Sequence, residues 1–145
     1  MNIRIASIND LPKILGLYKE LNPEDIGLDI TTAEVIWNRS KVKNTTEYYV
    51  AVEDNEIVGT CNISIIENLT RSGRPYAIIE NVITSIKHRR KGIGKQLIEK
   101  TIEKAKENNC YKLILLSSSK RIEAHKFYES IGFNGNSKKG FELRL

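Results

Sequence analysis

The chain has 145 residues, of which 40% are hydrophobic and 28% are charged. This length suits one domain over residues 1–145, and the composition is that of a soluble globular protein, which excludes collagen-like, low-complexity and disordered classes. Lys and Arg number 23 against 18 Asp and Glu, giving a formal net charge of +5. This excess indicates an anionic partner without identifying it.

Location and metal chemistry are constrained by what the sequence lacks. The apolar run at the N-terminus is too short for a signal peptide, and no stretch approaches the ~20 apolar residues of a membrane span. Cys61 and Cys110 lie in apolar, strand-like stretches and are expected to be free thiols. His88 and His125 lack metal-ligand spacing from either cysteine. We therefore expect a cytoplasmic protein with no membrane partner and no metal.

The first quarter of the chain predicts a strand followed by two helices. Residues 2–6 alternate as a short strand. Ser7, followed three residues later by Asp10, resembles a capping box that opens a helix. That helix ends before Pro23, and a second, short helix is expected to start at residues 31–32.

The rest of the chain alternates between strand and helix patterns. It predicts strands at residues 48–53, 57–66 and 76–84, a long amphipathic helix from Ile93 to about Asn108, a strand at 111–116, a helix through 124–131 and a closing hairpin over 133–145. Strands and helices mixed in this way indicate an α/β or α+β architecture, with one sheet covered by helices.

The basic run, residues 87–95, leads from the strand at 76–84 into the first turn of the long helix and is the segment that predicts the chemistry. It contains no acidic residue, and its five cations equal the whole net charge: Lys87, Arg89, Arg90, Lys91 and Lys95. Gly92 and Gly94 let the backbone approach a ligand closely, and the first turn of a helix presents free N–H groups with the positive end of its dipole. The segment therefore predicts a phosphate cradle.

Two common phosphate motifs do not fit this cradle. A dinucleotide fingerprint would need a third glycine where Leu97 stands. A Walker loop would need Ser or Thr after Gly94-Lys95, where the chain has Gln96. Arg89-x-x-Gly92-x-Gly94 instead resembles the acetyl-coenzyme A (acetyl-CoA) pyrophosphate loop of the GNAT superfamily of N-acetyltransferases, in the same place between a central strand and the long helix.

A second block supports the same resemblance. Residues 124–133, Ala-His-Lys-Phe-Tyr-Glu-Ser-Ile-Gly-Phe, resemble the superfamily's Ala-x-x-Phe-Tyr-x-x-x-Gly-Phe signature. The chain departs from the pattern at Ile86, where the superfamily often has Pro, and at Arg121, where it often has Asn. The resemblance covers the whole chain. It implies a GNAT fold, which is a central mixed, mostly antiparallel sheet of about six to seven strands, flanked by about four helices and splayed between strands 4 and 5.

The resemblance also implies acetyl-CoA as co-substrate and assigns its contacts. Backbone N–H groups of the loop would hold the pyrophosphate, and the pantetheine arm would pair with the strand backbone like an added strand. An N–H near Val82 would polarise the thioester carbonyl. The implied cofactor-binding residues are Val82, Ile83, Thr84, Arg89, Arg90, Lys91, Gly92, Ile93, Gly94 and Lys95.

Two side chains are candidates for proton transfer. An ammonium with a pKa of ~10 must lose a proton before it attacks a thioester. Glu80, a carboxylate in an otherwise apolar strand, matches the superfamily's base, acting directly or through water; the alternatives are that it faces water or binds a basic substrate. Tyr128 matches the phenol that protonates the departing thiolate; the alternative is a core aromatic. Neither cysteine falls in a motif block, so we expect direct attack without an acyl-enzyme.

The predicted function is acetyl-CoA-dependent N-acetylation of a primary amine of a small molecule. A protein or peptide amine acceptor is the first alternative, and a non-catalytic module that binds CoA or RNA is the second. Nucleic acid is not the expected partner, because the positive charge is concentrated in one run rather than spread along a face. The acceptor is expected to be set mainly by residues 23–40 and 68–75, whose sequences follow no local pattern. A homodimer is a further possibility, because homodimers are common in the superfamily.

Overall fold

The computed structural model describes residues 1–145, whose contacts form two compact units, residues 1–114 and 115–145. The elements of the first unit are β1 (Asn2–Ile5), α1 (Leu11–Leu21), α2 (Ile30–Lys43), β2 (Thr46–Glu53), β3 (Glu56–Ile66), β4 (Tyr76–Thr84), α3 (Ile93–Glu107) and the start of β5 (Leu113–Leu115). The second unit contains α4 (Ile122–Ser130). The prediction of one domain over the whole chain stays a prediction.

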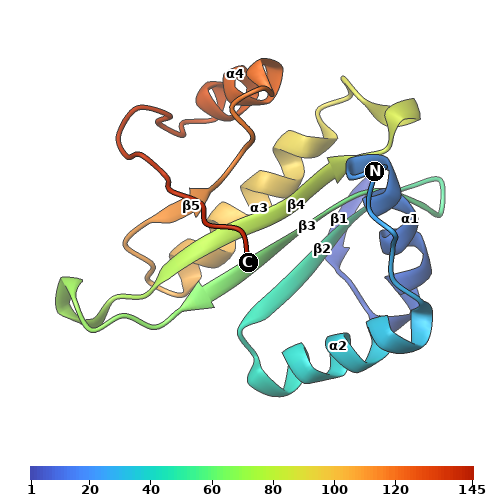
Figure 1. The fold of residues 1–145 in the computed structure, drawn as a ribbon, viewed down its shortest axis with the longest axis horizontal. Coiled ribbons are helices and arrows are strands. Elements are labelled where there is room, and N and C mark those ends of the chain that lie inside the picture. Colours follow the sequence, from blue (N-terminus) through green and yellow to red (C-terminus); the bar gives the residue numbers. More distant parts are fainter. The chain divides into compact units, whose positions relative to one another are not determined.

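One sheet contains all five strands, in the order β1-β2-β3-β4-β5 (Figure 1). The pairs from β1 to β4 are antiparallel. The chain enters β5 beside the start of β4, where Ala77 N–H donates to the Lys112 carbonyl at 3.0 Å. The mixed α/β class is confirmed, but the expected six to seven strands are wrong, because the sheet has five.

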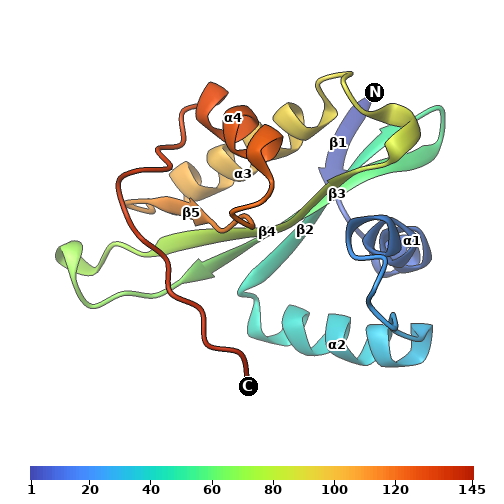
Figure 2. The ribbon, with the colours of Figure 1, turned by 45° about the horizontal axis from the view of Figure 1, so that its top comes forward.

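The helices of the first unit cover both faces of the sheet. Figure 2 shows α1 and α2 on one face and α3 on the other. The apolar stripe of α3 is buried, and α1 and α2 close a core whose buried members are Ala6, Leu11, Ile14, Ala33, Trp37 and Val50. No helix is both long and apolar enough to cross a membrane.

The two strands expected after α4 are absent. Residues 133–145 form turns and coil, so the predicted closing hairpin is wrong. The apolar alternation of Phe141, Leu143 and Leu145 fits a strand, but these side chains are 85% exposed or more. Alternation creates an apolar face, whereas a strand also needs a neighbour that accepts its backbone hydrogen bonds.

The predicted capping residues join β1 to the first helix. The Asp10 carboxylate accepts the Ser7 N–H at 2.7 Å, and the Arg4 guanidinium donates to both of its oxygens at 2.7 and 2.9 Å. The hydrogen bond from Arg4 is the main reason that the Asp10 pKa is lowered to about 2. This two-point contact fixes α1 against the edge strand.

The Arg4–Asp10 pair gives a pH-dependent stability. A carboxyl with a lowered folded-state pKa stabilises the fold fully above its unfolded pKa and loses that contribution as the pH falls from 3.8 to about 2. Asp10→Asn keeps the capping oxygen and removes the charge, and it should lower the free energy of unfolding by about 1–2 kcal/mol at pH 7, since Arg4 is partly exposed. Urea unfolding should show a smaller difference at pH 3; an equal difference would contradict a charge effect.

Candidate active site

The basic run forms an open loop between β4 and α3. Arg90 and Gly92 have φ values of 64° and 77°, so the chain turns sharply before the helix. The first helical hydrogen bond runs from Gln96 N–H to the Gly92 carbonyl at 3.2 Å. The N–H groups of the preceding residues, 93–95, therefore have no partner in the helix. Residues 89–92 are exposed, so these donors and their positive dipole end can meet an anion.

Side chains from the rest of the first unit hold this loop. The Arg89 side chain reaches back to the Thr84 carbonyl at 3.4 Å. From α1, the Glu20 carboxylate accepts the Ile86 N–H at 2.9 Å. A proline at position 86 has no N–H and would remove this bond. Ile86 therefore couples the loop to α1 through a bond that a proline could not make.

The charge of the loop is partly neutralised. Lys91 donates to Glu53 at 3.1 Å, and this bond is the main cause of the lowered Glu53 pKa. The His88 ring nitrogen lies 3.9 Å from the same carboxylate. Lys95 pairs with Glu99 at 3.9 Å on the helix surface. The cations without such a carboxylate partner are Lys87, Arg89 and Arg90.

The ladder between β3 and β4 contains one irregularity, a β-bulge in β4. Thr60 pairs with Ile83 and Asn62 pairs with Glu80, so Asn81 and Val82 together lie opposite Cys61. Asn81 has a φ of 54°, the left-handed conformation of the first residue in a bulge of the G1 type. We refer to Asn81 and Val82 as the β4 bulge. Bulges of this kind redirect side chains and backbone groups next to active sites.

Glu80 immediately precedes the β4 bulge and is exposed. Tyr48 pairs with Asn62 and Asn62 with Glu80, so the three side chains form a row across three strands on one face. Trp37 of α2 packs against Tyr48 with ring centroids 5.1 Å apart, which places the row on the α1 and α2 face. The Tyr48 pKa is raised, mainly by burial and then by the charge of Glu80.

The same face contains a polar atom without a partner. The Tyr18 hydroxyl of α1 is buried and makes no hydrogen bond. Burial, followed by the neighbouring Tyr48, raises its pKa, so the phenol keeps its proton. This hydroxyl is a protonated donor that no other group of the chain uses.

The second half of β4 offers backbone groups to a ligand. Val82 has no partner in the β3 register, while Ile83 and Thr84 face Thr60 and Gly59. β5 begins beside the start of β4 and has only three residues, compared with nine in β4. The end of β4 therefore continues past β5, as expected for a sheet that splays at these strands.

Tyr128 belongs to the second unit, where it lies on α4. Its ring packs against Phe127 and Phe133, with centroids 5.2 and 6.1 Å away. Its carbonyl accepts the Phe133 N–H at 3.1 Å. The side chain is 9% exposed, which fits the core-aromatic interpretation and is compatible with a hydroxyl that reaches a ligand. Its acid role stays a prediction.

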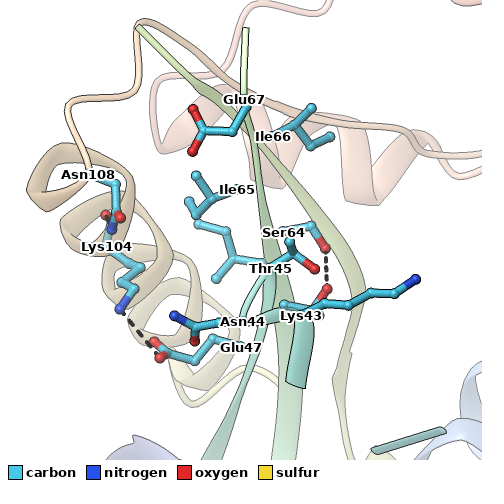
Figure 3. Close-up of a pocket in the computed structure, with 12 residues that line it drawn as sticks. Lys43, Asn44, Thr45, Glu47, Ser64, Ile65, Ile66, Glu67, Lys104 and Asn108 are labelled. Carbon is cyan, nitrogen blue, oxygen red and sulfur yellow. Dashed lines mark hydrogen bonds and ion pairs between the residues drawn. The ribbon is translucent and has the colours of Figure 1, made fainter. Parts of the chain in front are cut away.

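A groove of about 690 Å³ lies elsewhere in the first unit, between the sheet and the end of α3. Figure 3 shows Lys104 of α3 reaching Glu47 of β2, and the two form an ion pair at 3.3 Å. The groove also includes Asn108, just past the last residue of α3, whereas the basic loop leads into the first residue of that helix. Fifteen helical residues separate them by about 22 Å. The groove is therefore not part of the candidate site, and two of its charged side chains, Lys104 and Glu47, pair with each other.

Sequence reasoning proposed Glu80, the second half of β4 and the loop, which are consecutive in the chain, and Tyr128, which lies in the second unit; their roles stay predictions. It did not select the neighbouring residues Glu20, Tyr18, Tyr48, Asn62 and Asn81. Asn81 had a usable signal, because asparagine is depleted in strands and tolerates a positive φ. Its place in the apolar run 76–84 marks a bulge, as an isolated glycine would.

Comparison with known proteins places the chain in a family. The model of the acetyltransferase (GNAT) family matches residues 14–133. The chain is 29% identical over 145 residues to glucosamine 6-phosphate N-acetyltransferase of Trypanosoma brucei brucei, a match that covers 100% of the chain and 95% of the relative. It is 33% identical over 104 residues to the protein of the same name from Schizosaccharomyces pombe, with 70% of the chain and 88% of the relative covered.

A solved structure with a similar fold comes from Agrobacterium tumefaciens str. C58, from a protein assigned as an acetyltransferase. It has a TM-score of 0.94 and 39% identity, and the match covers 100% of both chains.

Packing at Gly59 of β3 sets how closely α3 approaches the sheet. A Cβ at this position would lie 3.0 Å from the Ile83 carbonyl oxygen and 3.1 and 3.2 Å from the Ile93 and Leu97 side chains. Gly59→Ala should therefore destabilise the fold by about 1–3 kcal/mol, because backbone or helix must move. Gly16→Ala, in an exposed part of α1 with no atom within 4 Å, should stabilise it by about 0.5–1 kcal/mol. Thermal unfolding checks both; equal effects would contradict the tight α3 contact.

Proposed function

The chain belongs to the acetyltransferase (GNAT) family, whose members use acetyl-CoA, and we propose that it transfers the acetyl group to a primary amine of a small molecule by direct attack within a ternary complex. The observation that carries this proposal is the continuous segment from Glu80 to Lys95. It contains a carboxylate, a bulge with an unpaired residue, a strand end past β5, and an open basic loop at a helix N-terminus.

The cofactor role of this segment follows from its free main-chain donors. The N–H groups of residues 90–95 hold the pyrophosphate, with Arg89 shaping the loop. Val82, Ile83 and Thr84 pair with the pantetheine amides as an added strand would. Main-chain donors suit this task because they are fixed by the fold and lose little entropy on binding.

Proton transfer is assigned to two side chains. Glu80, directly or through one water, takes a proton from the acceptor ammonium, and the freed amine attacks the thioester carbon. The Val82 N–H donates to the carbonyl oxygen as negative charge develops on it. When the carbon–sulfur bond breaks, Tyr128 gives its proton to the thiolate, which leaves as the free thiol of CoA. The acetylated nitrogen loses its second proton, which restores the Tyr128 phenol and leaves a neutral amide.

The first acceptor to test is an amino sugar phosphate, because the two relatives above are named glucosamine 6-phosphate N-acetyltransferases. The half-buried Tyr48 ring, whose pKa the charge of Glu80 helps to raise, supplies an aromatic surface near that carboxylate. Rings with hydroxyl groups match such a surface.

The activity can be tested by acetyl-CoA-dependent release of free thiol with a panel of glucosamine 6-phosphate, other amino sugars, aminoglycosides, polyamines and peptides. We expect turnover with a small-molecule amine and intersecting lines when both substrates are varied. Gly92→Glu should abolish CoA binding in calorimetry, because it adds bulk and negative charge to the cradle. A ping-pong pattern would exclude direct attack, and turnover only with peptides would favour the alternative acceptor.

The two proton-transfer roles predict different kinetic signatures. Tyr128→Phe should lower kcat by about 10–100-fold and leave CoA affinity unchanged. Glu80→Gln should lower turnover by a similar factor at neutral pH. Turnover should recover as the pH approaches ~10, the pKa of a primary ammonium, because the acceptor then needs no base. Titration calorimetry with CoA supplies the control, because it shows whether each variant still binds the cofactor. Unchanged kcat in either variant removes that residue from the mechanism.

A further inference from the structure

The β4 bulge is bridged by a side-chain hydrogen bond from the neighbouring strand. Asn81 Nδ2 donates to Asn62 Oδ1 at 3.0 Å. Asn62 is 6% exposed, while Asn81 lies at the surface. The bond therefore joins a buried residue of the regular β3 strand to the residue of β4 that has the positive φ.

The left-handed conformation of Asn81 needs support. For a residue other than glycine this region is sparsely populated, and asparagine enters it more readily than most. A buried amide also loses free energy if its hydrogen bonds are not made. The Asn62–Asn81 bond meets both needs together, since it satisfies Asn62 and holds the side chain of Asn81 on one side of the strand.

The position of the bond determines what it controls. Asn81 stands between Glu80 and Val82, so its φ and ψ set the direction of the next peptide N–H, which is that of Val82. Asn62 is also the central member of the row that joins Tyr48 to Glu80. One amide pair therefore lies between the Glu80 carboxylate and the peptide N–H of Val82, the bulge residue outside the β3 register.

We propose that Asn62 and Asn81 are positioning residues for acetyl transfer: their hydrogen bond locks the β4 bulge and so fixes the Val82 N–H relative to Glu80. This proposal rests on the proposed function of the same site. Neither residue transfers a proton. Small errors in the direction of an oxyanion donor are costly, because the donor acts only where the charge develops in the transition state.

The proposal is tested with two variants that break the bond in different ways. Asn81→Gly keeps the positive φ accessible and removes the donor, and Asn62→Leu keeps the branched shape of the side chain and removes the acceptor. Each should lower kcat about 10-fold or more, with the dissociation constant for CoA within twofold of wild type. Because Asn81 is exposed, Asn81→Gly should remain folded even if Asn62→Leu does not, and thermal unfolding records this.

Two further variants separate positioning from general stability. Ser64→Ala removes another side-chain bond between neighbouring strands, the 2.9 Å contact with Thr46, and should leave kcat unchanged. Asn62→Asp keeps an oxygen acceptor for Asn81 and should retain most of kcat. Its added charge near Glu80 should also move the acidic limb of the pH profile to higher pH.

The outcomes distinguish the failure of the positioning role from the failure of the proposed acetyltransferase function. If wild-type protein transfers no acetyl group to any acceptor of the panel, the proposed function fails. If wild type is active and Asn81→Gly keeps full kcat, the positioning role is wrong and the function stands. Equal losses of kcat in Ser64→Ala and Asn81→Gly would likewise overturn it, because they would indicate loss of sheet stability.

Discussion

Backbone groups that lie outside the regular strand and helix patterns are the constraint on which the candidate site depends. A fold normally pairs such groups, and here the β4 bulge leaves Val82 outside the β3 register while the start of α3 leaves its first donors open. Both exceptions lie within 14 residues of one continuous segment. Donors held in this way are directed before a ligand arrives, so little reorganisation accompanies binding.

Several long-range contacts of the first unit hold this segment in place. Gly59 admits the side chains of α3 to the sheet, and Glu20 of α1 holds the peptide at Ile86. The α1 helix, which packs on the same face of the sheet as Glu80, is thus bonded to the loop proposed to hold the pyrophosphate. A displacement of α1 would therefore alter both the proposed acceptor position and the proposed cofactor position.

The extent of prediction from sequence follows the range of each interaction. β4 was predicted with its observed bounds, because a β-branched run between turn signals is a local pattern. The basic loop and the start of α3 are local in the same sense. The Asn62–Asn81 and Glu20–Ile86 bonds join residues 19 and 66 positions apart, and no spacing rule marks them. Phe141 to Leu145 has strand alternation but no strand, because pairing depends on a neighbour that the pattern does not specify.

Charge separates the two proposed substrates. The net excess of +5 lies in the loop, where Glu53 and Glu99 already pair with two cations and leave Lys87, Arg89 and Arg90 for an anion. The face with Glu80 contains aromatic rings, amides and that carboxylate, and the pKa of Tyr48 is raised by burial and by the charge of Glu80. An ammonium is therefore repelled by the loop and attracted to Glu80, while a pyrophosphate has the opposite preference. The fold thereby directs an amine toward the bulge and away from the cradle, whatever the rest of the acceptor is.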